Sequence, residues 1–151
     1  MIHNIIKKMK IKYYLYPILL SFLFLPVNSN ENFYDQAKEL FNKNYNEKSK
    51  FLFQRNIVYN PKDSKSYLYL AKIFKLEEDK RAEEKNIKTS LLLDPKNEEA
   101  MYLLIDMELE RSNFSRAEEL KADFKIICVK MCEKMDSIKE RLNAFDNKDE
   151  S

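Results

Sequence analysis

Apolar and polar residues alternate with a helical period along most of this chain. In the stretch FYDQAKELF, the apolar residues Phe33, Ala37 and Phe41 are spaced as on one face of an α-helix. The segment 67–74, YLYLAKIF, has the same spacing, and polar breaks such as 44–46, NYN, separate such segments. The pattern therefore predicts short amphipathic helices joined by tight turns.

Landmark residues of these helices recur at a fixed interval. Phe33, Tyr67 and Met101 are each 34 residues apart, and so are the helix-ending prolines Pro61 and Pro95. A period of this length is typical of arrays of helical hairpins. One hairpin cannot bury its apolar face alone, so the hairpins must stack.

We therefore predict an all-α fold, a right-handed stack of three hairpins. The units are expected at 30–63, 64–97 and 98–131, followed by a cap helix at 133–145. Two capping boxes, at Ser115 and Ser137, support helix starts in the last unit and in the cap helix. The charged residues 146–151 are expected to form a disordered tail.

The first thirty residues differ from the rest. They contain four lysines and no acidic residue, and an apolar run of about 15 residues at 13–27 follows the basic start. This pattern is typical of a signal peptide, and we expect cleavage after Ser29. The alternatives are an uncleaved anchor at 13–27 and a start at Met9. Export to a periplasm-like compartment is the expected location, with tethering to the inner membrane as the alternative.

Composition narrows the function classes. After residue 29, basic and acidic residues nearly balance and are interspersed, which does not favour nucleic-acid binding. Glycine is absent, so the chain has no glycine-rich phosphate loop. The only histidine is His3, ahead of the expected cleavage site. Carboxylates lie among lysines at helical spacing, as on a solvated face. We expect no catalytic residue, cofactor or metal.

The second unit resembles the tetratricopeptide repeat family. Size-compatible residues, Tyr67, Leu70, Ala71 and Phe74, occupy the first four slots of the family pattern, and Glu83, Ile87 and Pro95 fill the later ones. The first unit departs from it at Gln36 and Asn56. The third departs at Ile105 and Glu108 and lacks a closing proline, as a terminal repeat can.

This resemblance implies a concave groove, lined by the first helix of each hairpin, that holds a peptide or a partner helix. The slots that face the groove in the family are Tyr34, Lys38 and Phe41, then Leu68, Lys72 and Lys75, then Tyr102, Asp106 and Leu109. Aromatic side chains bury contact area at low entropic cost, and the lysines favour an acidic partner. The alternative is that the two tyrosines pack within and between hairpins.

Cys128 and Cys132 are the only cysteines. An even pair in an oxidising compartment favours a disulfide, here one that joins the last repeat to the cap helix. Their spacing suits a disulfide poorly inside a regular helix, but a turn near 128–132 relieves the geometry. The alternatives are two buried free thiols, a redox-active pair and, least favoured, a zinc site.

The sequence thus predicts a non-enzymatic module that binds another protein, a small exported adaptor or assembly factor. The alternatives are a membrane-anchored accessory subunit of an envelope complex and a thiol-redox protein that uses its cysteine pair.

Overall fold

The computed structural model describes residues 32–149 of the chain. This part consists of seven α-helices and contains no β-strand. The helices are α2 (Phe33–Asn42), α3 (Asn46–Tyr59), α4 (Ser64–Leu76), α5 (Lys80–Leu93), α6 (Glu98–Glu110), α7 (Phe114–Ile127) and α8 (Lys134–Asp149). The all-α prediction is therefore confirmed for this part of the chain.

The predicted signal segment at 1–29, including the apolar run at 13–27, lies outside the described residues. Within residues 32–149, no helix combines the length and the apolar character needed to cross a membrane.

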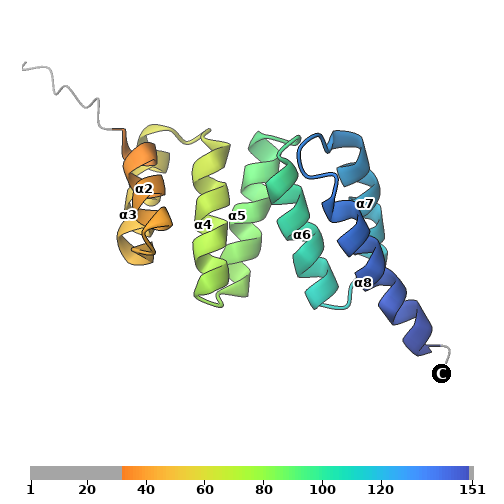
Figure 1. Cartoon of the computed structure of the whole chain (residues 1–151). Coiled ribbons are helices and arrows are strands. Elements are labelled where there is room, and N and C mark those ends of the chain that lie inside the picture. Colours follow the sequence, from red (N-terminus) through yellow and green to blue (C-terminus); the bar gives the residue numbers. More distant parts are fainter. Residues whose placement is uncertain (1–31, 150–151) are drawn as a thin grey trace, which may run out of the picture. The chain divides into compact units, whose positions relative to one another are not determined.

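Successive helices pack as hairpins that follow one another in a row (Figure 1). α2 packs against α3, α4 against α5 and α6 against α7, and the second helix of each hairpin also packs against the first helix of the next. α8 contacts both α6 and α7, as the first helix of a further hairpin would. The result is a helical repeat-like array, as the 34-residue interval predicts.

The turn inside each hairpin has the same backbone conformation. Asn44, Glu78 and Ser112, spaced by the 34-residue interval, have positive φ angles of 61°, 60° and 58°. The next residue in each turn donates its backbone N–H to the carbonyl five positions earlier, at 2.9–3.0 Å. These bonds satisfy carbonyl groups that the helix end leaves unpaired. The chain builds these left-handed turns without glycine.

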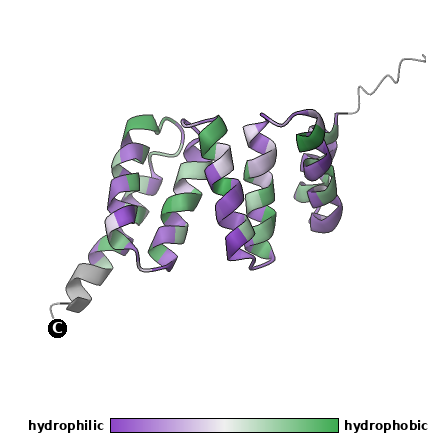
Figure 2. Ribbon diagram, turned by 180° about the vertical axis from the view of Figure 1, so that it is seen from behind, coloured by the Kyte–Doolittle hydropathy of each residue, from purple (hydrophilic) through white to green (hydrophobic). Residues whose placement is uncertain are grey.

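Polar side chains fix the starts of three helices. The side-chain oxygens of Asn32, Asp79 and Asn97 each accept a hydrogen bond from the backbone N–H three residues later, at 3.2, 2.9 and 3.0 Å. Such caps satisfy donors that have no partner within the helix. Apolar and polar bands alternate along the helices that these caps begin (Figure 2).

The core divides into two clusters. The first is built on α2, α3 and α4 and contains Ala37, Phe53, Leu70 and Ile73. The second runs from α4 to α8 and contains Ala71, Ile87, Met101, Leu104, Ile105, Met107, Leu109, Ala117, Leu120, Phe124, Ile138 and Leu142. α4 therefore contributes to both clusters.

The last hairpin and the cap helix are joined by residues 128–133. Cys128 has an extended backbone and ends α7, so both cysteines lie in the connection between helices. α8 continues to Asp149, beyond the predicted end of the cap helix at 145. The stretch FDNKD contains neither proline nor glycine, which is consistent with a helix that does not stop at 145.

Candidate functional site

The nine predicted groove residues lie on the first helix of each hairpin, three each on α2, α4 and α6. Their exposure differs. Leu68 and Leu109 are buried in the packed interior, at 5% and 3% exposure. Lys38 is exposed, and the other six are partly buried. The surface that a partner could touch is therefore narrower than the full set of slots.

The aromatic members of the first two hairpins form one continuous group. The ring of Tyr69 stacks on Phe53 at 4.9 Å between centroids, and it meets Phe41 edge-on at 5.2 Å and Tyr34 at 6.0 Å. Phe53 is fully buried, whereas the other three rings are partly exposed. We call Tyr34, Phe41 and Tyr69 the aromatic platform.

Tyr69 was not among the predicted residues. It directly follows Leu68, which the resemblance places in the groove, but Leu68 is the buried one of the two. The choice depends on how far α4 is rotated about its own axis, which the 34-residue interval does not determine. The three aromatic residues in the segment YLYLAKIF were the only feature of the sequence that pointed to an aromatic surface on this helix.

Burial changes the acidity of the platform tyrosines. Desolvation, together with the nearby Tyr69, Asp63 and Asp35, raises the pKa of Tyr34 to about 12. Burial also raises the pKa of Tyr69, and a hydrogen bond with Tyr34 opposes this. Both phenols therefore stay neutral over the physiological range and can offer O–H groups as hydrogen-bond donors.

Two of the three predicted steering lysines are already paired within the chain. Lys72 contacts Glu99 at 2.5 Å and also lies over the ring of Tyr69, 4.6 Å from its centroid. Lys75 pairs with Asp106 and lies 3.6 Å from Glu110. These charges are therefore neutralised locally and hold α4 to α6.

Asp106 links three helices. It accepts from Lys75 of α4 and from Arg141 of α8, the latter at 2.6 Å. Burial alone would raise the pKa of Asp106, but the hydrogen bonds from the two cations outweigh it and hold the pKa below its ordinary value. Asp106, a predicted groove residue of the third unit, thus joins the repeats to the cap helix α8.

Tyr102, the last predicted aromatic residue, packs within the array. Its ring lies 6.5 Å from Phe124 of α7, and the ammonium of Lys134 in α8 lies 5.9 Å from its centroid. It is not a member of the aromatic platform, and Leu68, the equivalent groove slot of the second unit, is buried.

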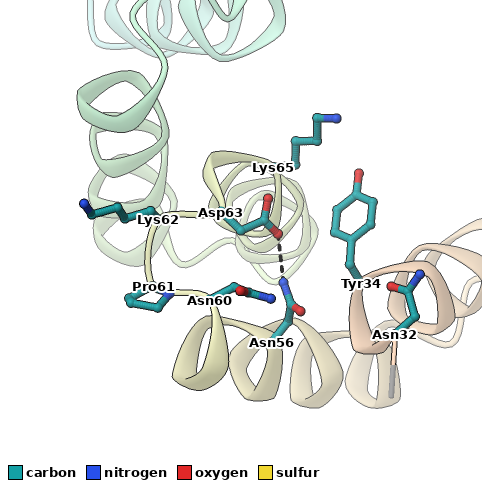
Figure 3. Close-up of a pocket in the computed structure, with 8 residues that line it drawn as sticks. All are labelled: Asn32, Tyr34, Asn56, Asn60, Pro61, Lys62, Asp63 and Lys65. Atoms are coloured by element: carbon teal, nitrogen blue, oxygen red, sulfur yellow. Dashed lines mark hydrogen bonds between the residues drawn. The ribbon is translucent and has the colours of Figure 1, made fainter. Parts of the chain in front are cut away.

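A pocket of about 640 Å³ opens between α2, α3 and the start of α4 (Figure 3). Its wall includes Tyr34 of the platform, so the pocket adjoins that surface. The lining residues are Asn32, Tyr34, Asn56, Asn60, Pro61, Lys62, Asp63 and Lys65. The wall is thus rich in amides and carries two ammonium groups and one carboxylate. We call it the amide pocket.

Asn56 is held rigidly at this pocket. It is 5% exposed, and its amide nitrogen donates to Asp63 at 2.8 Å and to Ser66 at 2.9 Å. Both amide hydrogens are used in this way, which leaves the carboxamide oxygen as the atom that can accept. Figure 3 shows that oxygen on the side toward Tyr34 and Asn32. The sequence identifies Asn56 only as a departure from the family pattern, and these hydrogen bonds could not be predicted from it.

The cysteine pair lies at the other end of the array. The Cα atoms of Cys128 and Cys132 are 5.2 Å apart, within the range of disulfides. The carboxylate of Glu98 accepts from the backbone N–H groups of Lys130 and Met131, at 2.9 and 2.8 Å. The connection is therefore tied to the start of α6. Nowhere in residues 32–149 do three or more metal-ligating side chains gather.

Comparison with known proteins bears on the fold. No protein-family model matches the chain, and no curated protein matches it in sequence. Among solved structures, the Type III secretion translocator chaperone SycD of Yersinia enterocolitica is similar, with a TM-score of 0.68. The match covers 88% of this chain and 94% of that one at 15% identity. The likeness supports the helical repeat-like fold.

Proposed function

We propose that this chain is a non-catalytic adaptor that binds a segment of another protein. The observation that carries the proposal is the aromatic platform, whose three rings stay partly exposed and whose Tyr34 also lines the amide pocket. Aromatic residues that remain accessible next to a hollow are typical anchors for a partner. A fold similar to that of a secretion chaperone supports the same reading.

The fold that we propose in detail is a right-handed stack of tetratricopeptide-type hairpins. The equal spacing of the hairpin turns and of the core positions supports this form. In such a stack the first helices of successive hairpins line the concave side, and the platform on α2 and α4 would receive the partner there.

Selection from a random peptide library tests the function. Peptides of about twelve residues, roughly 40 Å long when extended, would be selected on the full chain and their affinities measured. Replacing Tyr34 and Tyr69 by alanine should lower the affinity for these peptides by about thirtyfold, since both rings would be lost from the contact. The matched control replaces Val58 and Leu92, which are exposed on second helices, and should leave affinity unchanged.

A second measurement does not depend on altering the packed rings. Benzoylphenylalanine placed at Lys38, which is exposed on α2, should crosslink a bound peptide, whereas the same group at Lys85, exposed on α5, should not. If Lys85 crosslinks and Lys38 does not, binding occurs on the second helices and the platform is not the site.

We also propose that the protein is exported and that Cys128 and Cys132 form a disulfide in that compartment. The intact mass of native protein would be lower by the first 29 residues and by two hydrogens. A full-length mass supports instead the membrane-anchored accessory subunit, for which the apolar run at 13–27 is the specific observation.

A further inference from the structure

The same slots carry different charges in the two junctions between first helices. Between α4 and α6, Lys72 pairs with Glu99 at 2.5 Å. Counting back 34 residues, the equivalent slots between α2 and α4 are Lys38 and Lys65. The second junction thus places a lysine against a carboxylate, whereas both equivalent slots of the first junction hold a lysine.

Both lysines of the first junction are exposed, and neither forms an ion pair with another residue of the described part of the chain, 32–149. Two ammonium groups at neighbouring slots disfavour each other, and a carboxylate placed between them would relieve this. The chain's own Lys72–Glu99 contact is the template for such a pairing. The first junction therefore lacks a carboxylate that the second one contains.

The amide pocket adjoins this junction. Lys65 of α4 and Tyr34 of α2 both line this pocket (Figure 3). Lys62 adds a second ammonium to the wall. The one carboxylate of the wall, Asp63, is already engaged by Asn56 and by Ser66, the latter at 2.6 Å. The charged side chains that line the pocket, Lys62, Lys65 and Asp63, therefore leave a net charge of +1.

We propose that this junction is the recognition site for an acidic, extended segment of the partner. A glutamate or aspartate of that segment lies between Lys65 and Lys38, as Glu99 lies against Lys72. The carboxamide oxygen of Asn56 accepts from a backbone N–H of the same segment. The proposal rests on the proposed function and gives it a partner chemistry. It also moves acid recognition from Lys72 and Lys75, which are paired internally, to Lys38 and Lys65.

The test uses the full chain and two labelled peptides of about twelve residues, roughly 40 Å when extended, with amidated C-termini. One carries glutamate at alternate positions among alanine and leucine, and the other carries glutamine there. The glutamate peptide should bind about tenfold more tightly, and its affinity should fall as salt is raised. A third peptide, with glutamine and a free C-terminus, should behave like the glutamine peptide. If it binds as the glutamate peptide does, the carboxylate recognised is terminal and the side-chain form of the proposal is overturned.

Charge reversal separates recognition from folding. Lys65→Glu should lower affinity for the glutamate peptide about tenfold, while thermal stability stays equal or rises because Glu would face Lys38. Lys85→Glu makes the same charge change on α5 and should leave binding unchanged. The double variant Lys38→Glu, Lys65→Glu should bind a lysine-substituted peptide in preference to the glutamate peptide, which a purely structural role would not produce.

Equal affinity of the unaltered chain for the glutamate and glutamine peptides would overturn the proposal, as would unchanged binding by the Lys65→Glu variant. If both peptides bind equally and both are lost when Tyr34 and Tyr69 are replaced, the adaptor function stands and only the acidic specificity fails. If the chain binds neither these peptides nor any from the random library, both proposals fail.

Discussion

The two junctions between first helices share one backbone plan and differ in what joins them. Between α2 and α4, aromatic rings meet, with Phe41 edge-on to Tyr69 and Tyr34 at 6.0 Å from it. Between α4 and α6, ion pairs meet, with Lys72 on Glu99 and Lys75 on Asp106. The repeat thus fixes where the helices lie, while the side chains at equivalent slots decide whether aromatic rings or paired charges join them.

The difference extends into the core. The cluster beneath the aromatic junction is small and contains one fully buried large ring, Phe53, whereas the cluster beneath the ionic junction continues to α8. Local stability follows the number of buried apolar contacts. The first hairpin is therefore expected to open before the others, and the partner site that we propose includes residues of this hairpin and of α4.

The largest expected effect comes from removing the central ring of the first cluster. Phe53→Ala should lower the free energy of unfolding by about 3–5 kcal/mol, because the ring is buried between Tyr34 and Tyr69. Hydrogen exchange should accelerate in α2 and α3 while α6 and α7 stay protected. The matched variant is Ile87→Ala in the second cluster, and exchange that accelerates equally everywhere in both variants would show a single cooperative core.

A smaller effect is expected at the ionic junction. Asp106→Asn should cost about 1–2 kcal/mol at neutral pH, because Lys75 and Arg141 both lose a partly buried partner. The folded-state pKa of Asp106 is lowered, so its contribution is present above the ordinary value of 3.8 and is lost as pH falls through the folded value. Urea unfolding at several pH values should show the two proteins converging in acid.

Asp136→Asn is the control for that measurement. Its carboxylate lies 3.5 Å from Lys139 but is 89% exposed, so the same chemical change should alter stability by less than about 0.5 kcal/mol. If both variants lost the same free energy of unfolding, partial burial would add nothing to the strength of the ion pairs of Asp106.

The smallest effect on stability is expected from the Tyr34 hydroxyl of the platform, and only at alkaline pH. The pKa of Tyr34 is raised to about 12 from 10.0, so the stability contributed by the neutral phenol is complete below pH 10 and is lost as pH rises toward 12. Tyr34→Phe should therefore lose less stability over that range than the unaltered chain. Tyr45→Phe, at a ring that is 56% exposed, is the control and should follow the unaltered chain.

Much of the fold could be predicted from the sequence because it depends on positions that recur. Ala37, Ala71 and Ile105 are all fully buried, as their common slot predicts, and the hairpin breaks fall where polar residues interrupt the apolar pattern. The nine predicted groove slots lie on α2, α4 and α6, the first helices of the hairpins. These features are local or periodic, and so a single sequence contains them.

The site could be predicted less well because it depends on contacts between hairpins. The pairing of Lys72 with Glu99 joins residues 27 positions apart, and only the angle between α4 and α6 decides whether they meet. The sequence likewise does not tell which of Leu68 and Tyr69 is buried. Glu83 occupies a small-residue slot and is nevertheless 1% exposed, with Lys80 at 3.5 Å.

The three hairpin turns have a practical consequence for engineering. Asn44, Glu78 and Ser112 all adopt a left-handed backbone, which asparagine tolerates but which costs most other residues with a β-carbon about 1–2 kcal/mol. Glycine would relieve that cost at Glu78 and Ser112 with no change to the platform or to the amide pocket. A more stable variant of the protein could thus be made by substitutions in its hairpin turns, without altering the surface that we assign to the partner.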